Sequence, residues 1–166
     1  NPVGVEADVE GGHVRAILGR HALPGPGPWS TADPNSLLDA GALDDALRAA
    51  HADGGEDGLR RLGRDYAALW ARTFRTLVRQ LRGRPERALS LFVAEVYPFL
   101  RGDRLAARVE QAMPNGARVS LAAGLPPNYI AGLAEGFVAL SGAKPAAVAT
   151  SLPASASVAL DIAWTL

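Results

Sequence analysis

Few residues of this chain are of the types that do chemistry, and their spacing favours no reaction. The chain has three histidines, His13, His21 and His51, and no cysteine. None of the histidines has a second histidine four residues away, which is the spacing that lets a helix hold a metal ion. The composition is compatible with a Ser–His–Asp triad, but the Gly-x-Ser-x-Gly turn that exposes a nucleophilic serine is absent. The sequence therefore predicts neither a metal site nor a catalytic residue.

Arginines form the most regular pattern of charge. Residues 1–56 carry nine acids and three arginines, whereas residues 57–108 carry twelve arginines and five acids. In the second segment arginines recur every three or four residues, with an interruption at Ala68. This spacing places them on one face of a helix: Arg61, Arg64, Arg72, Arg75, Arg79 and Arg82.

Three partners could pair with this arginine face. Phosphates of a nucleic acid are one, but aromatic residues suited to base stacking are not interleaved on the face, so nucleic acid is not expected. The other two are the acidic first third of the chain and a protein partner, which includes a second copy in a homodimer. The alternative is a solvated face. The candidate partner-binding residues are Arg61, Arg64, Arg72, Arg75 and Arg79.

Aromatic residues are few and fall mainly on the expected helices. We expect most of them to meet between the helices and a sheet, where rings either fill the core or line an apolar pocket with a few polar groups. The candidate pocket residues are Trp70, Phe74, Phe92, Tyr97, Tyr129 and Phe137. Gly132 and Gly136 lie four residues apart on the same helix face, and we expect them to allow close packing of that helix.

Length and composition indicate the class of protein that must position these residues. The chain has 166 residues, of which 48% are hydrophobic and 20% charged, and its formal net charge is zero. These values favour one globular domain over residues 1–166 and exclude collagen-like and wholly disordered chains. No signal peptide and no membrane-spanning apolar run are present. We therefore expect a cytoplasmic protein that does not contact a membrane.

The first two thirds of the chain read as helices. Residues 1–55 form a helical part with a proline-rich connector at 23–35, because four prolines there exclude regular helix. Helical spacing is found over Val9–Gly19 and over Asp39–Ala52, before Gly54 and Gly55. The strongest pattern predicts one long amphipathic helix from Gly58 to about Arg82. A further helix follows from Glu86 to about Tyr97.

The last third reads as strands around one helix. Two alternating runs flank Asn115-Gly116, which predicts a hairpin whose turn residues take positive φ. One face of the hairpin would carry Ala107, Val109, Gln111 and Met113 on its first strand. A helix capped by Asn128 runs to about Ser141, and strands follow near Ala146–Ser151 and Ser157–Trp164. The fold class is therefore α+β: N-terminal helices and a long amphipathic helix packed on a four-stranded antiparallel sheet of β-β-α-β-β topology.

Several of these segments together resemble a known superfamily. They are the helix starting Leu62-Gly63-Arg64-Asp65-Tyr66, the helix opening Asn128-Tyr129-Ile130-Ala131-Gly132 and the last strand ending Ile162-Ala163-Trp164. Residues 56–166 resemble the 4-vinyl-reductase-like domain, whose superfamily also includes haem nitric-oxide-binding domains and vesicle-tethering subunits of the TRAPP complex. This resemblance implies a small apolar ligand, or a partner, held between helices and sheet.

Two departures from that superfamily bear on cofactors. The region before the last strand carries cysteines in vinyl-reductase-like domains, whereas residues 150–157 here contain none. The haem-binding branch has an axial histidine and a Tyr-x-Ser-x-Arg motif, and none of Tyr66, Tyr97 or Tyr129 begins such a motif. No cofactor is predicted, and haem is not expected.

The resulting hypothesis is a non-catalytic bacterial sensor or regulatory module that binds a small hydrophobic molecule. An alternative is a protein–protein interaction module that acts as a scaffold or in dimerisation. A third hypothesis, an enzyme acting on a tetrapyrrole, follows only from the name of the superfamily. The sequence leaves the identity of the ligand, the oligomeric state and the pathway open.

Overall fold

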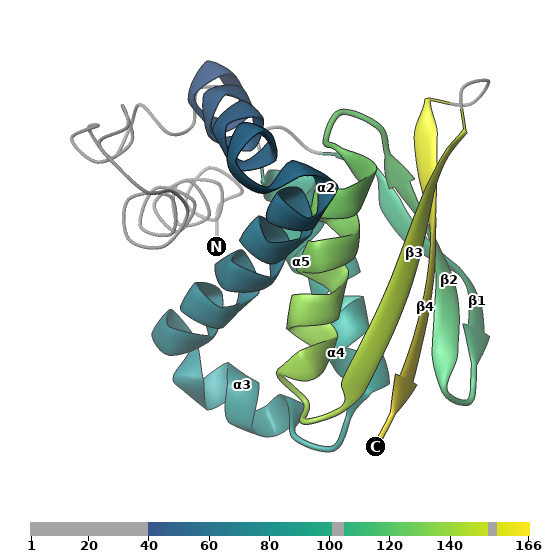
Figure 1. Ribbon diagram of the computed structural model, residues 1–166. Helices are drawn as coiled ribbons and strands as arrows, with labels where there is room; N and C mark the ends of the chain where they lie inside the picture. Colours follow the sequence, from purple (N-terminus) through teal and green to yellow (C-terminus); the bar gives the residue numbers. More distant parts are fainter. Residues whose placement is uncertain (1–39, 101–104, 153–155) are drawn as a thin grey trace.

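A four-stranded antiparallel sheet with helices packed on one of its faces makes up the described part of the chain (Figure 1). The structure is a computed structural model that describes residues 40–100, 105–152 and 156–166. The expected helix Val9–Gly19, the connector 23–35, His13 and His21 lie outside the described residues. The strands and helices confirm the expected α+β class. No helix among the described residues has the length and apolar character that a membrane span requires.

Helix α2 covers Ala40–Thr73 and contains a kink at Gly55, whose φ of 62° and ψ of −147° are not helical. Glycine adopts a positive φ without the steric cost of a Cβ, so the helix changes direction at this residue. The sequence predicted a helix end at Gly54 and Gly55, and the structure places the change of direction there. The half of α2 after the kink buries Leu59, Leu62 and Tyr66.

The single helix expected from Gly58 to Arg82 is wrong. Helix α2 ends at Thr73, and α3 covers Arg75–Leu81. Phe74 lies between them with φ −106° and ψ 45°. Backbone hydrogen bonds continue on both sides, from Phe74 N–H to Trp70 O at 3.1 Å and from Val78 N–H to Phe74 O at 3.0 Å. The apolar spacing therefore continues through the break, which is why periodicity could not reveal it.

The next helix starts at Pro85, one residue before its expected first residue, and changes type along its length. Helix α4 covers Pro85–Leu91, the π-helical turn η3 covers Phe92–Val96, and the 3₁₀ turn η4 covers Tyr97–Phe99. A π turn holds one more residue than an α turn, which rotates the side chains that follow it. Phe92, Val93, Val96 and Tyr97 are all buried.

The hairpin is present, but its turn differs from the predicted one. Strand β1 covers Ala107–Met113 and β2 covers Gly116–Ala122, so Pro114 and Asn115 form the turn. Gly116 belongs to β2 and its φ is not positive. A Cβ there would lie 2.6 Å from Ile162 O, so glycine is needed for close strand approach rather than for the turn.

A bulge in β1 also changes which residues share a face. Val109 pairs with Val119, whereas Gln111 pairs with Arg118, so Glu110 is the extra residue. After the bulge Gln111 and Met113 face opposite to Ala107 and Val109, and the expected common face of these four is wrong. Alternation in the sequence continues through a bulge and does not reveal it.

The remaining elements follow the predicted order with longer strands. Helix α5 covers Pro127–Ala139, β3 covers Lys144–Leu152 and β4 covers Ser157–Thr165. The sheet order is β1-β2-β4-β3, so β1 and β3 are its edges. Val158, Leu160, Ile162 and Trp164 of β4 are buried together, as expected. Figure 1 shows α5 lying against the sheet, with α2 on the other side of α5.

The expected cap of α5 is wrong. The helix begins at Pro127 and its N-cap is Pro126, with no side-chain cap. Proline suits the first position of a helix because its ring fixes φ and because the N–H it lacks would have no helical partner. The Asn128 amide instead donates to Glu56 Oε2 at 2.6 Å, which joins the first turn of α5 to α2.

Candidate functional site

Most of the predicted pocket residues meet in one cluster of rings. The ring centroids of Trp70 and Phe137 lie 5.1 Å apart, and those of Phe92 and Phe137 lie 5.3 Å apart. Tyr97 approaches Phe92 at 5.9 Å, and Phe74 approaches Trp70 at 4.6 Å. These separations are those of rings in direct contact. The cluster joins α2, the segment Phe92–Tyr97 and α5.

Two further aromatic residues, Tyr129 and Tyr66, are also buried. Tyr129 is buried in the first turn of α5. Tyr66 is also buried, with its ring centroid 6.3 Å from that of Phe137, and was not among the predicted pocket residues. Its position four residues before Trp70 on the same helix face was the available signal. The rings contact one another between the helices, and a ligand pocket among them stays a prediction.

A very close crossing of α2 and α5 positions these rings. A Cβ on Gly132 would lie 2.0 Å from Arg60 O, and a Cβ on Gly63 would lie 2.5 Å from Leu133 N. A Cβ on Gly136 would lie 2.6 Å from the Cβ of Ala67. These distances are shorter than any van der Waals contact, so the crossing requires glycine. The expected packing role of Gly132 and Gly136 is confirmed.

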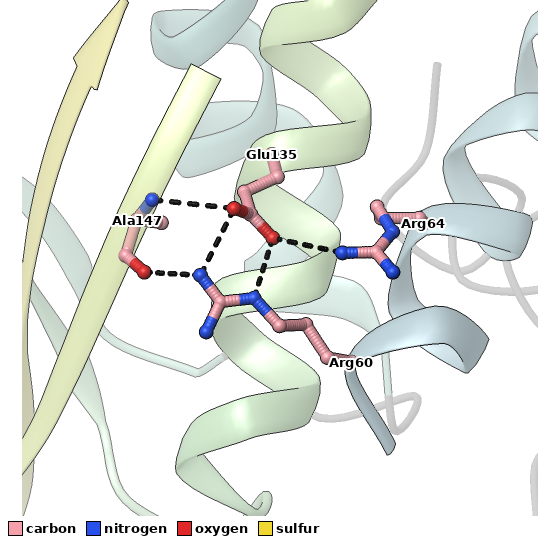
Figure 2. Close-up of polar contacts among 4 residues, drawn as sticks. All are labelled: Arg60, Arg64, Glu135 and Ala147. Carbon is pink, nitrogen blue, oxygen red and sulfur yellow. Dashed lines mark hydrogen bonds and ion pairs between the residues drawn. The ribbon is translucent and has the colours of Figure 1, made fainter. Parts of the chain in front are cut away.

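A polar network lies at the same crossing (Figure 2). The carboxylate of Glu135 on α5 accepts hydrogen bonds from Arg60 Nε at 2.7 Å and Arg60 Nη2 at 2.9 Å. It also accepts from Arg64 Nη1 at 3.4 Å and from the backbone N–H of Ala147 at 3.3 Å. Arg60 Nη2 donates in addition to Ala147 O. The network therefore ties α2, α5 and the edge strand β3 together.

The network satisfies the backbone of an edge strand. Ala147 pairs with Ile162 of β4 on one side and has no strand on the other. Its N–H and C=O are instead paired with Glu135 and Arg60, which take the place of a neighbouring strand. Buried backbone groups without partners are costly, so this pairing permits Ala147 to be buried. Neither Arg60 nor Glu135 was among the residues predicted from the sequence.

Charge state follows from these contacts. Burial raises the pKa of Glu135, but hydrogen bonding and the charge of Arg60, the Ala147 N–H and the charge of Arg64 together lower it, and the net direction is below its ordinary value of 4.5. The hydrogen bond to Glu135 raises the pKa of Arg60. Both groups are therefore charged at neutral pH, and Glu135 is not poised to transfer a proton.

This depressed pKa predicts a pH-dependent contribution to stability. Between the folded-state pKa and 4.5 the unfolded chain binds more protons at Glu135 than the folded chain, so acid favours unfolding. The contribution is fully present above 4.5 and is lost as pH falls through the folded-state pKa. We expect the difference in free energy of unfolding between the wild type and Glu135→Gln to shrink as pH falls below 4.5 in urea titrations. A difference that stays constant with pH would contradict this expectation.

A hollow of about 510 Å³ opens beside the same crossing. It lies between the first half of α2, the turn of α2 after the kink and the connection from β2 to α5. Leu47, Leu59 and Pro126 supply apolar surface. Its other lining residues are Asp44, Arg48, His51 and Gly124. A volume of this size holds a small organic molecule.

The polar groups around this hollow already have partners of their own. His51 Nε2 lies 3.3 Å from Glu56 Oε1, and Arg48 forms an ion pair with Asp45. Both pairs are exposed and contribute little free energy, so a polar group of a ligand can replace one partner of either pair at a small cost in free energy. The aromatic pocket candidates do not line this hollow. A helix kink and a loop form it. Gly54 and Gly55 indicated the position of the kink, but the sequence pattern did not indicate the angle that opens the hollow.

The predicted arginine face is divided by the break at Phe74. Arg61, Arg64 and Arg72 lie on α2, whereas Arg75 and Arg79 lie on α3. Arg64 is engaged with Glu135. The other four are exposed. The single helix expected under these residues is therefore broken at Phe74, and their role in binding a partner stays a prediction.

The histidine and methionine of the described residues are not placed to bind a haem. His51 is the single histidine among the residues 40–100, 105–152 and 156–166, and it is exposed and paired with Glu56. The only methionine of the chain, Met113, is exposed on β1. In the ring cluster, the Tyr97 hydroxyl donates to Ala122 O, and the indole nitrogen of Trp70 is a donor only and has no lone pair for a metal. In the described part of the chain, no group of three or more acidic, histidine or cysteine side chains could hold a metal ion.

Solved structures show what this fold is similar to. An Fe(II) unliganded H-NOX protein from K. algicida matches with a TM-score of 0.63 and 11% identity, over 98% of this chain and 96% of that chain. A mutant of the same protein matches with a TM-score of 0.65 and 12% identity, over 93% and 86%. A Cs H-NOX mutant with 4-cyano-L-phenylalanine matches with a TM-score of 0.51 and 13% identity, over 96% of each. No protein-family model and no curated protein matches the sequence.

These likenesses define the class of the fold. The chain has an H-NOX-like fold, in agreement with the haem nitric-oxide-binding branch of the superfamily expected from the sequence. At 11% and 12% identity the likeness concerns the fold alone. Membership of the wider 4-vinyl-reductase-like superfamily stays a prediction.

Proposed function

We propose that this chain is a non-catalytic sensor module that binds a small, mainly apolar molecule without haem. The observation that carries the proposal is the hollow bounded by Leu47, Leu59 and Pro126. A fold similar to that of H-NOX proteins supports a sensor. The donor set described above supports a ligand other than haem. The class of ligand that fits is an apolar ring or chain with one polar end, because Arg48 and His51 border the apolar surface.

Binding at this hollow can change the angle between the two halves of α2, and that change can serve as a signal. The hollow joins parts of the chain that two glycines with positive φ allow to change direction, Gly55 in α2 and Gly124 before α5. A molecule that contacts Leu47, Leu59 and Pro126 at once favours one angle between the two halves of α2. The population of that angle would then report occupancy.

A fluorescent apolar anion tests the proposal directly. Anilinonaphthalene sulfonate combines fused rings with one acidic group and matches the lining of the hollow. We expect saturable binding to the folded chain. The His51→Trp variant places a large side chain in the hollow from an exposed position, and we expect about a tenfold loss of affinity, which corresponds to about 1.4 kcal/mol.

The matched control is Ser90→Trp, which adds the same side chain at an exposed site on α4. Circular dichroism melting curves verify that both variants fold. If the two variants bind the dye equally well, the hollow is not the binding site. If the folded wild-type chain does not bind the dye, the proposed ligand class is wrong.

A further inference from the structure

We propose that arginines from the end of α2 to the start of α4 form a docking site for an acidic segment of a partner protein, one that carries an apolar side chain among its carboxylates. This basic corner consists of Arg72 on α2, Arg75 and Arg79 on α3, Arg82 and Arg84 in the turn between α3 and α4, and Arg87 on α4. It shares no residue with the hollow proposed to bind a ligand, so each proposal can fail without the other. In Figure 1, α3 lies at the lower left, away from the sheet.

The charges of the basic corner are uncompensated within the described residues. All six side chains belong to exposed residues. The described ion pairs of arginine involve other positions, such as Arg48, Arg60 and Arg118. Residues 72–87 contain a single acid, Glu86. Six like charges over so short a segment repel one another, and a row of carboxylates relieves that repulsion while forming paired hydrogen bonds with guanidinium groups.

The backbone that carries these arginines is held in place. Gly83 has a φ of 74°, and its N–H donates to Ser141 O at 2.8 Å. The Arg84 N–H donates to Leu81 O at 2.9 Å, and Leu81 and Pro85 are buried on either side. The turn between α3 and α4 is thus fixed to the end of α5. A site that is already ordered loses little conformational entropy when a partner binds.

A hollow that is partly apolar lies within the basic corner. About 380 Å³ of space is bordered by Phe74, Arg75, Thr76, Leu77 and Gln80. Phe74 and Leu77 are only half-buried, and they contact the core from this side. The hollow offers a place for one aliphatic or aromatic side chain beside Arg75. Apolar anchor and charged surroundings together match an amphipathic acidic segment.

The same features disfavour a nucleic acid. Single strands bind where exposed aromatic rings stack on bases, but Trp70 is buried and Phe74 packs on it at 4.6 Å between ring centroids. The basic corner is therefore better suited to a short acidic segment.

Fluorescence anisotropy with the full chain tests the proposal. The probe is a fluorescein-labelled peptide made of glutamates with interspersed leucines. We expect saturable binding that weakens strongly when salt rises from about 0.05 M to about 0.5 M, because exposed charges are screened. The Arg75→Glu/Arg79→Glu variant should bind at least about tenfold more weakly, since attraction turns into repulsion at two positions.

Two controls separate this site from general charge effects. Arg108→Glu/Lys144→Glu makes the same change in net charge at exposed positions on the sheet, and we expect it to bind the probe like the wild type. Leu77→Asn keeps all the arginines and should weaken binding by removing apolar contact, while an all-glutamate peptide should bind less well than the glutamate–leucine peptide.

Equal loss in both charge variants would overturn the proposal, because net charge alone would then explain binding. Tighter binding of a DNA duplex or single strand than of the peptide would assign the corner to nucleic acid instead. Melting curves of each variant ensure that lost binding does not reflect unfolding.

Discussion

Replacing Gly132 with alanine is expected to lower the free energy of unfolding by about 3 kcal/mol, even though alanine is the better helix former by about 1 kcal/mol. A Cβ at this position would lie 2.0 Å from the carbonyl oxygen of Arg60. That oxygen belongs to the backbone of α2 and cannot rotate away. The helices must separate, and the contacts of Tyr66 and Trp70 with Phe137 across the crossing weaken as a result.

Urea unfolding followed by circular dichroism measures this effect. Gly54→Ala is the matched control, since a Cβ there meets only the end of the Arg61 side chain at 3.2 Å, which can move. We expect the control to be neutral or slightly stabilising. Gly136→Ala should fall between the two, because the nearest atom is the Cβ of Ala67 at 2.6 Å. A Gly132→Ala variant as stable as the wild type would show that the crossing is looser than described.

Removing the carboxylate of Glu135 has the second large effect. Glu135→Leu leaves Arg60 without its charged partner and the Ala147 N–H without an acceptor. A fully buried pair would lose about 3 to 5 kcal/mol, but the Arg60 side chain is 27% exposed and can be partly hydrated. We therefore expect a loss of about 2 kcal/mol in the free energy of unfolding.

A double-mutant cycle distinguishes two causes of this loss of stability: the lost attraction between Arg60 and Glu135, and the unpaired charge left on Arg60. Arg60→Met/Glu135→Leu removes both charges and fills the space with apolar atoms of similar size. If the cost comes from a buried unpaired charge, the double variant recovers most of the stability lost in Glu135→Leu. The residual loss reflects the unpaired N–H and C=O of Ala147. A double variant that is less stable than Glu135→Leu would contradict this explanation.

Local patterns predicted the order of elements well because burial repeats regularly along each of them. The strand containing Val158, Leu160, Ile162 and Trp164 and the close packing of the helix with Gly132 were both evident from spacing. Single-residue irregularities were not. Phe74, Glu110 and Pro126 each break an element or shift its register or start, and none disturbs the alternation of apolar and polar residues around it.

The site was less predictable for a physical reason. Arg60 and Glu135 are 75 positions apart, and a sequence pattern cannot show that a glycine crossing brings them together. The aromatic residues were easier, because large apolar side chains gather wherever helices meet. Their large apolar side chains predicted the ring cluster, whereas the hollow depends on the direction taken by the chain at Gly55. Backbone direction is set by packing between elements and not by local periodicity.

The structure of the two sheet edges, β1 and β3, affects whether the protein aggregates at high concentration. An open edge exposes N–H and C=O groups to which a strand from another molecule can add, the first step toward fibrils. At β3, Arg60 and Glu135 already occupy the outward groups of Ala147, and Pro145 two residues earlier has no N–H to offer. At β1, the extra residue Glu110 interrupts the regular spacing that a foreign strand needs. Each edge is thus blocked over part of its length, which disfavours the addition of a strand from another molecule.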